Sequence, residues 1–296
     1  MATAEEMKWG ITGGGGQLAR SLSELLQKKR IPYKSWDRQE MDITDLKSLE
    51  KIAQYKPSVL VNCAAWTNVE GAEDSFDEAI RVNRDGAANV AEIAKKLNIP
   101  IIHISTDYVF SGVNKRAWMV DDSTFPTSNY GRSKLQGERA LFEIWPEKSI
   151  IFRTAWLYGP FGKNFAKSII RKAIISKEKI LVVNDQFGQP TTTLDLAKQI
   201  FQAMNSGISA GTYHATNAGE ASWWEFAREL VKLSDEDTDR VIPISSQELN
   251  SKVKRPAYSV LDHSDWSKVG MQGMRDWQSA LLEVFPEIKI SVEKEK

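Results

Sequence analysis

The chain has 296 residues, long enough for a large core and one or two domains. Lysine plus arginine and aspartate plus glutamate number 39 each, so the charge balance favours neither a nucleic-acid partner nor an anionic membrane. A single cysteine, Cys63, excludes an internal disulfide framework and favours the reducing cytoplasm. No apolar run approaches the roughly 20 residues of a membrane helix, and residues 1–8 are too polar for a signal peptide.

The first half of the chain alternates short apolar runs with longer amphipathic ones, which is the pattern of βαβ units. Apolar runs predict strands at residues 8–12, 32–36, 58–63, 101–105 and 149–153. Helical spacing predicts helices at residues 17–28, 45–55, 72–97 and 130–142, the third broken near Asn83. The expected fold is therefore α/β, with a doubly wound, Rossmann-like parallel sheet.

The rhythm changes after Gly159. Helices are expected at residues 164–175, 191–204, 222–233 and 275–285, and short strands at residues 180–183 and 241–244. Ser222 stands at an N-cap position with Glu225 three residues later. Residues 212–216 can return to the first sheet, and the charged tail, residues 291–296, is expected to fray. We expect one domain over residues 1–160, with returning segments near 187–217, and a smaller C-terminal lobe mainly over residues 161–296.

A glycine loop follows the first predicted strand and reads G-x-x-G-x-x-A from Gly13 through Gly16 to Ala19. Glycines there let the backbone approach a pyrophosphate at the positive end of a helix, which predicts a dinucleotide-binding first domain. Asp37 ends the second strand, where a carboxylate can accept from ribose hydroxyls. The next residue, Arg38, can instead pair with a 2′-phosphate, so the sequence leaves NADH and NADPH both open. The alternative is that both side chains are ordinary charged residues in a solvated loop, with no role in binding.

Tyr130 and Lys134 are four residues apart and therefore share one face of a helix. The pair alone is a weak motif, but its chemistry is useful. A tyrosine with a pKa of about 10 transfers protons reluctantly at neutral pH, and a neighbouring ammonium is expected to lower that pKa. Thr106, at the end of the fourth predicted strand, can hydrogen-bond a substrate carbonyl and orient Tyr130. The three residues together predict a catalytic site rather than a turn and a chance pair.

These residues resemble the extended short-chain dehydrogenase/reductases and, within them, the dTDP-4-dehydrorhamnose reductase family. The resemblance covers nearly the whole chain. The segments that carry it are residues 12–19, 42–45, 61–70, 105–112, 129–138, 152–158, 164–167, 185–191 and 255–256. The Ser-Thr-Asp-Tyr-Val-Phe and Asp-Gln-x-Gly-x-Pro-Thr stretches among them are fairly specific for this branch.

The resemblance implies NADPH- or NADH-dependent reduction of the C4 keto group of dTDP-4-dehydro-L-rhamnose to dTDP-L-rhamnose. Tyr130 would give the proton to the C4 oxygen, Lys134 would tune Tyr130 and bind the nicotinamide ribose, and Thr106 would hold the carbonyl. The residues placed around the sugar are Val69, Asp107, Tyr108 and Trp156. Those placed around the cofactor are Gly13, Gly16, Gln17 and Leu18 at the pyrophosphate, Asp42 and Ile43 at the adenine, and Cys63, Ala64 and Ala65 along the cleft.

The chain departs from the family pattern at several positions. Ala19 replaces the last glycine of the loop, a mild change, and Cys63 replaces an alanine as a small buried hydrophobe. Trp66 is bulkier than the usual residue and can reshape the sugar pocket. Some members bind magnesium at a dimer interface through acidic residues, where this chain has Ser21, Leu194 and Lys198. We therefore expect no metal, and a homodimer is left open. The three histidines are scattered and are expected to serve the core or the surface.

Three alternatives share parts of this pattern. One is a reductase of another dTDP-4-keto sugar, of the dihydrostreptose type. Another is an epimerase or dehydratase, which retains its NAD. The third is a non-catalytic protein on the same fold, such as the regulatory subunit of methionine adenosyltransferase. Thr106, Tyr130 and Lys134 together favour catalysis, because a purely binding role does not require them.

Overall fold

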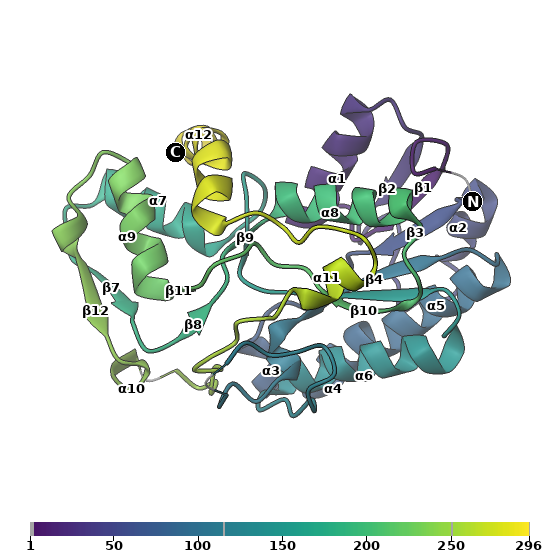
Figure 1. Cartoon of the computed structure of the whole chain (residues 1–296), viewed down its shortest axis with the longest axis horizontal. Helices are drawn as coiled ribbons and strands as arrows, with labels where there is room; N and C mark the ends of the chain where they lie inside the picture. The colour runs from purple at the N-terminus through teal and green to yellow at the C-terminus, as the bar shows by residue number, and fades with distance from the viewer. Residues whose placement is uncertain (1–2, 115, 250, 296) are drawn as a thin grey trace.

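The computed structural model describes residues 3–114, 116–249 and 251–295 (Figure 1). Its main sheet has six strands in the order β10-β5-β4-β3-β1-β2, and every neighbouring pair is parallel. The strands are β1 (Trp9–Thr12), β2 (Tyr33–Trp36), β3 (Val59–Asn62), β4 (Ile101–Thr106), β5 (Ser149–Thr154) and β10 (Gly211–His214). The predicted doubly wound parallel sheet is confirmed, as is the return of the later segment that forms β10.

Helices cover both faces of this sheet because successive strand residues point to opposite sides. Val59 and Val61 of β3 face a core shared with α1 and α8, whereas Leu60 faces a core shared with α2, α5 and α6. The elements of this domain are α1 (Gln17–Lys28), α2 (Glu50–Tyr55), α3 (Gly71–Asp74), α4 (Phe76–Ile80), the π-helix η1 (Arg81–Gly86), α5 (Ala87–Lys96), the 3₁₀ turn η2 (Asp107–Val109), α6 (Asn129–Ile144) and α8 (Thr193–Ser206). Within the described residues, no helix is both long and apolar enough to span a membrane.

A third hydrophobic core, around Tyr158, Phe226 and Phe285, lies in a smaller lobe. Figure 1 shows α7, α9, β7 and β12 set apart from the six-stranded sheet. The lobe and its connections contain β6 (Leu157–Tyr158), α7 (Phe165–Ile175), β7 (Ile180–Val183), β8 (Phe187–Gly188), β9 (Thr191–Thr192), β11 (Ala221–Ser222), α9 (Trp223–Leu233), η3 (Thr238–Arg240), β12 (Val241–Ile244), α10 (Ser246–Leu249), α11 (Ser264–Lys268) and α12 (Trp277–Lys294). The capping box predicted at Ser222 and Glu225 is present.

Two predicted helices of the first domain have different bounds. The helix expected from residue 45 begins only at Glu50, because Asp42 and Asp45 accept hydrogen bonds from backbone N–H groups two residues later and hold a turn instead. The helix expected over residues 72–97 is interrupted at Ser75 and again in η1. The second interruption confirms the break predicted near Asn83.

The last helix is much longer than predicted. We expected it over residues 275–285 with a frayed tail, but α12 runs through Pro286 to Lys294, and residue 296 lies outside the described part. The apolar face continues past the proline, since Ile288 and Val292 are fully buried in the lobe core. Glu295 then forms ion pairs with Lys167, at 2.5 Å, and with Arg171.

The continued face of α12 gives a stability test. Replacing Ile288, which is 0% exposed, with alanine should lower the free energy of unfolding by about 2–5 kcal/mol, because it leaves a cavity. The matched control is Ile290→Ala on the same helix, where the side chain is 49% exposed and the loss should stay within about 0.5 kcal/mol. Urea denaturation measures both. Equal losses for the two variants would contradict the packing described here.

Candidate active site

The candidate catalytic residues lie where β4 and β5 end. Thr106 is the last residue of β4 and pairs with Thr154, the last residue of β5. Helix α6 approaches this edge so closely that a Cβ at Gly131 would lie 2.3 Å from the carbonyl oxygen of Tyr108. The rings of Tyr108 and Tyr130 meet edge to face, with centroids 5.5 Å apart. The structure thus brings Thr106 and Tyr130 together at the carboxyl edge of the sheet, where such folds bind ligands.

The Tyr130 hydroxyl is held in its protonated form. Burial raises its pKa to about 12, a hydrogen bond with Thr106 opposes that rise, and the charge of Asp107 adds to it. Thr106 itself caps η2, since its Oγ1 accepts from the Tyr108 backbone at 3.2 Å and donates to Asp107 Oδ1 at 3.0 Å. The hydroxyls of Thr106 and Tyr130 therefore face the same space as a coupled pair.

Lys134, about one helical turn after Tyr130 on α6, is only 2% exposed. Its Nζ donates to the Ile104 carbonyl oxygen at 2.5 Å and lies 3.4 Å from His103 Nε2. Burial lowers its pKa to about 8, against the opposing charge of Glu138. Burial opposes the expected lowering of the Tyr130 pKa by Lys134, because it penalises the phenolate and the ammonium alike, and this role of Lys134 stays a prediction.

The residues predicted to surround a sugar come from the ends of three adjacent strands. Asp107 follows β4 and is 2% exposed, and burial raises its pKa to about 6 against hydrogen bonds from Ser259 and Thr106. Tyr108 follows it, Trp156 lies just beyond β5, and Val69 is half-buried in the segment after β3.

Trp156 is held in a conformation that side chains rarely adopt. Its φ is +47°, a genuine outlier for so bulky a residue. Its ring stacks on Trp223 with centroids 3.5 Å apart, and a Cβ added at Gly188 would lie 2.6 Å from it. The indole therefore lies between Trp223, the first residue of α9, and Gly188 of β8. These contacts connect the lobe to the residue just beyond β5.

The predicted cofactor residues also converge. Gly13 has a φ of +73°, and a Cβ there would lie 2.6 Å from the Ala64 nitrogen, so the glycine loop packs directly on the segment from Cys63 to Ala65. Gly16 is the N-cap of α1 and offers no side-chain cap, which leaves N–H groups at the helix start for a phosphate. A pocket of about 740 Å³ beside the loop is lined by Gly14, Gly15 and Asp37, among others.

Some predicted cofactor residues can contribute only backbone. The side chains of Leu18 and Ile43 are each 4% exposed and pack into the two cores of the first domain. Gln17 donates to the Leu157 carbonyl oxygen at 3.2 Å. Cys63 packs against the core and burial raises the pKa of its thiol to about 12, which confirms a small hydrophobe rather than a reactive thiol.

The acidic residues beyond β2 shape a turn. Asp37 Oδ1 accepts from the backbones of Gln39 and Glu40, each at 2.9 Å. Burial disfavours the Asp42 carboxylate, but hydrogen bonds from Thr44 and the charge of Arg38 lower its pKa. Arg38 is exposed beside them. The charged side chains at the end of β2 are therefore of both signs.

Sequence reasoning missed a buried polar network behind the catalytic residues. Glu138 accepts two hydrogen bonds from Arg153, at 2.7 and 3.0 Å, and one from Ser105. A second set of hydrogen bonds runs from Asn62 through His103 to Lys134. One signal was available: Glu138 follows Lys134 by four residues, so a charged residue on the buried face of the helix required partners.

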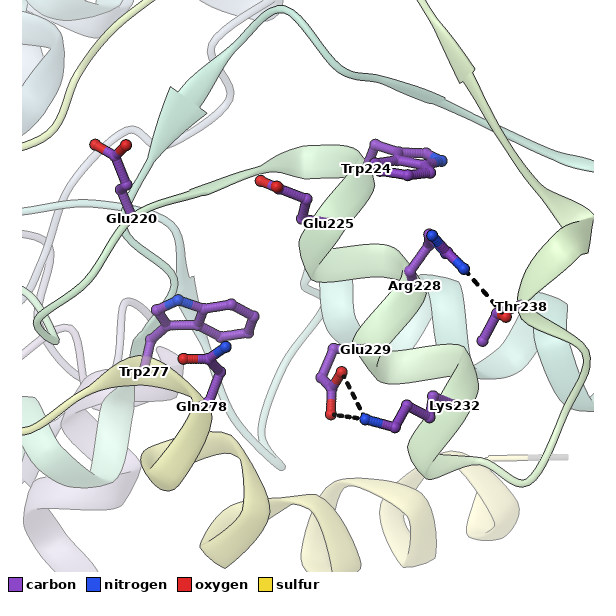
Figure 2. A pocket seen from close by; sticks show the side chains of 9 residues that line it. All are labelled: Glu220, Trp224, Glu225, Arg228, Glu229, Lys232, Thr238, Trp277 and Gln278. Atoms are coloured by element: carbon purple, nitrogen blue, oxygen red, sulfur yellow. Dashed lines mark hydrogen bonds and ion pairs between the residues drawn. The ribbon is translucent and has the colours of Figure 1, made fainter.

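A second pocket, of about 420 Å³, is lined by residues of α9, by Thr238 of η3 and by the first residues of α12 (Figure 2). None of the predicted site residues lines it. Its Glu225 serves the capping box, its Glu229 pairs with Lys232 at 3.2 Å, and its Arg228 reaches Thr238 at 3.4 Å. Its polar side chains are thus largely engaged with one another, and the pocket is separate from the catalytic cluster.

Two of the positions where acidic metal ligands were looked for, Ser21 and Lys198, make contacts within the chain. Ser21 donates to Thr193 at 2.8 Å, and Lys198 pairs with Glu283 at 3.2 Å. Among the residues that the structure describes, no group of three or more histidine, cysteine, aspartate or glutamate side chains is placed to hold a metal ion.

Known proteins resemble this chain over nearly its whole length. The family model described as the RmlD substrate binding domain matches residues 7–290. A dTDP-4-keto-6-deoxy-D-glucose reductase of Streptomyces niveus is 40% identical, over 94% of this chain and 96% of the relative. A dTDP-4-dehydrorhamnose reductase of Streptomyces griseus is also 40% identical, over 94% and 93%. The crystal structure of a dTDP-4-dehydrorhamnose reductase from Bacillus anthracis in complex with NADP has a TM-score of 0.91 at 34% identity, covering 95% of this chain and 99% of that one.

The raised pKa of Asp107 gives a test of the site's electrostatics. An aspartate whose pKa rises on folding adds stability only while protonated, so the wild type loses that contribution as pH rises through about 6. Asp107→Asn should therefore gain stability relative to the wild type between pH 4 and pH 7, by up to about 3 kcal/mol. Denaturant unfolding at both pH values measures the difference. A stability difference that stays constant with pH would contradict the raised pKa.

Proposed function

This chain belongs to the RmlD substrate binding domain family, and we propose that it is an NAD(P)H-dependent reductase of a dTDP-linked 4-keto-6-deoxy sugar. The substrate proposed first is dTDP-4-dehydro-L-rhamnose, which reduction at C4 converts to dTDP-L-rhamnose. The observation that carries the proposal is the meeting of Thr106, Tyr130 and Lys134 at one strand edge. The reductases among the relatives, at 34–40% identity, support the same activity.

The residues around the glycine loop fit a dinucleotide. Side chains at Gly13 and Gly14 would collide with Ala64 and Ser35, so only glycines let the loop pack this closely against the segments that follow β3 and end β2. The N–H groups at the start of α1 would hold the pyrophosphate, and Asp37 or Arg38 the adenosine ribose. When bound, NADPH or NADH supplies the hydride that reaches the sugar's C4.

Tyr130 acts as the proton donor in this proposal. A phenol whose pKa burial raises to about 12 is fully protonated at neutral pH, which suits an acid that gives its proton to the C4 oxygen. Thr106 holds the same oxygen and orients the phenol through their hydrogen bond. Lys134, with a pKa of about 8, is mostly an ammonium at pH 7, and its positive charge would stabilise the phenolate left behind.

The sugar is proposed to contact Val69, Asp107, Tyr108 and Trp156. The stacked indole of Trp156 and the buried carboxylate of Asp107 are held in place without a ligand. Preorganised groups of this kind favour one orientation of a sugar. The similarity to the Streptomyces niveus enzyme supports a second candidate, dTDP-4-keto-6-deoxy-D-glucose. Both sugars carry the same C4 ketone, so the same three residues would serve either.

Three broader features also belong to this proposal. The first domain, residues 1–160 with returning segments near 187–217, would bind the cofactor, and the lobe mainly over residues 161–296 would close on the sugar. The separate cores of the two parts support this division. A homodimer and a cytoplasmic location complete the proposal, the latter because the one cysteine is a free thiol.

The activity is tested by following NADPH and NADH absorbance with each of the two dTDP-keto sugars. We expect oxidation of reduced cofactor that depends on the sugar, and faster turnover with dTDP-4-dehydro-L-rhamnose. Faster turnover with the other sugar would reassign the substrate. If the purified protein binds NADPH but oxidises it with neither sugar, the reductase proposal fails.

The role of Tyr130 predicts a selective loss. Tyr130→Phe should lower kcat by at least about 100-fold, because only the proton donor is removed, while NADPH affinity measured by fluorescence stays within a few-fold. Tyr213→Phe is a matched control, since Tyr213 lies in β10 and its hydroxyl donates to the Ser209 carbonyl oxygen. Unchanged turnover in Tyr130→Phe would remove this residue as the acid.

Arg38 predicts the cofactor preference. Arg38→Ala should raise the KM for NADPH about tenfold while leaving the KM for NADH nearly unchanged, since only NADPH carries a 2′-phosphate. The control variant Lys47→Ala removes another exposed positive charge nearby. Equal effects on both cofactors would contradict a contact with the 2′-phosphate and give Arg38 a structural role in the turn that contains Asp37 and Asp42.

A further inference from the structure

A chain of buried polar side chains runs from the glycine loop to Lys134. Thr12 donates to Asn62 Oδ1 at 2.6 Å, and the backbone N–H of Ala64 donates to the same oxygen at 3.2 Å. The Asn62 Nδ2 lies 3.0 Å from His103 Nδ1, and His103 Nε2 lies 3.4 Å from Lys134 Nζ. Asn62 is fully buried and His103 is 1% exposed, so these groups satisfy one another.

The order of donors in this chain fixes the tautomer of His103. A backbone N–H can only donate, so the Ala64 contact identifies the Asn62 atom that accepts as its oxygen. The other Asn62 atom is then an NH₂ group, which donates to His103 Nδ1. Burial holds the pKa of His103 well below its ordinary value, so the ring is neutral and carries one proton. That proton must sit on Nε2, the nitrogen that faces Lys134.

We propose that His103 is a positioning residue that presents an N–H to Lys134, fixes its amine beside the Ile104 carbonyl and favours the neutral amine over the ammonium. A neutral amine has a lone pair that can accept from His103 Nε2–H while one of its own N–H groups donates to Ile104. An ammonium has no lone pair, and its positive charge would face the positive end of the His103 N–H bond. The catalytic consequence of this proposal rests on the proposed function, because it concerns the lysine one helical turn after Tyr130.

The other groups that face Lys134 leave this effect of His103 in place. Glu138 on α6 favours the ammonium, but its carboxylate is already paired with Arg153 of β5. Cys63, after β3, stays a neutral thiol, since burial raises its pKa to about 12. Tyr130 is a neutral phenol at pH 7. Removing the His103 N–H should therefore raise the pKa of Lys134.

The tautomer is tested without substrate or turnover. ¹⁵N NMR of the histidine-labelled protein resolves the three histidines, and the spectrum of His103→Gln identifies the His103 signals. We expect a protonated Nε2 and an unprotonated Nδ1 for His103 throughout pH 6–8. A proton on Nδ1, or a ring that titrates in this range, would overturn the proposal.

The effect on Lys134 is tested by a pair of variants. Glutamine at position 103 can still accept from Asn62 and present an N–H to Lys134, whereas leucine can do neither. NMR titration of the ¹³Cε of Lys134, assigned with Lys134→Met, should show a pKa raised by roughly one unit in His103→Leu and nearly unchanged in His103→Gln. Thermal unfolding and NADPH binding establish that each variant is folded.

Several outcomes decide the proposal. A Lys134 pKa that is unchanged or lowered in folded His103→Leu contradicts it. If His103→Leu does not fold, a Lys134 pKa in His103→Gln that departs from the wild type by more than about half a unit contradicts it instead. Failure of the proposed function is distinguishable, because it would abolish turnover while leaving the tautomer and the titration as stated. If the function holds, the basic limb of the pH profile of kcat should move upward with the Lys134 pKa in His103→Leu alone.

Discussion

The buried ion pair between Glu138 and Arg153 is the interaction on which the candidate site depends. Their side chains are 4% and 7% exposed, and Ser105 adds a hydrogen bond to the same carboxylate. These three residues come from α6, β5 and β4, so one carboxylate ties the helix to the two strands whose ends form the site. A buried pair of this kind strongly penalises loss of either partner, by about 3–5 kcal/mol, because the other charge stays uncompensated. It therefore fixes the rotation of α6 about its axis.

That rotation places the catalytic residues. Tyr130, Lys134 and Glu138 follow one another at four-residue spacing, so a helix anchored at Glu138 turns all three toward the sheet. Two glycines then let α6 approach its neighbours closely, since a Cβ at Gly137 would lie 2.2 Å from the Asn83 carbonyl oxygen and one at Gly131 would meet η2. Asn83 lies in the π-helix and bonds both Trp66 and Ser133. The π-helix η1 and the glycines of α6 thus contact each other directly, and both are needed for the close approach of the two helices.

The sequence predicted the parts of the fold that local pattern controls. Contiguous apolar residues marked β3 and β4, and helical spacing marked α1 and α6, because burial on both faces of a parallel sheet leaves a direct trace in the chain. It also placed Thr106 and Tyr130 together, since Thr106 ends a parallel strand and the helices of such a sheet begin at the same carboxyl edge. It failed at α12, which was expected to end at Phe285, because tertiary burial of Ile288 and Val292 continues the helix through Pro286.

The electrostatics of the site could not be predicted in this way. Whether Lys134 lowers the pKa of Tyr130 depends on how deeply both are buried and on what else the ammonium meets. His103 and Arg153 stand on different strands, 31 and 19 residues from Lys134. No spacing rule links such positions, so the network that governs Lys134 emerges only when β4, β5 and α6 are packed together.

The most direct test of the reductase account follows the hydride itself. Reaction of dTDP-4-dehydro-L-rhamnose with NADPH deuterated at C4 of the nicotinamide would be analysed by mass spectrometry and NMR of the nucleotide sugar. The nicotinamide C4 carries two hydrogens, and each is labelled in a separate reaction. The account predicts dTDP-L-rhamnose with one deuterium on C4 from one of these two labelled cofactors. It also predicts one NADP⁺ released for each sugar reduced. A sugar product without deuterium from either label, or a cofactor that is unchanged after turnover, would contradict it.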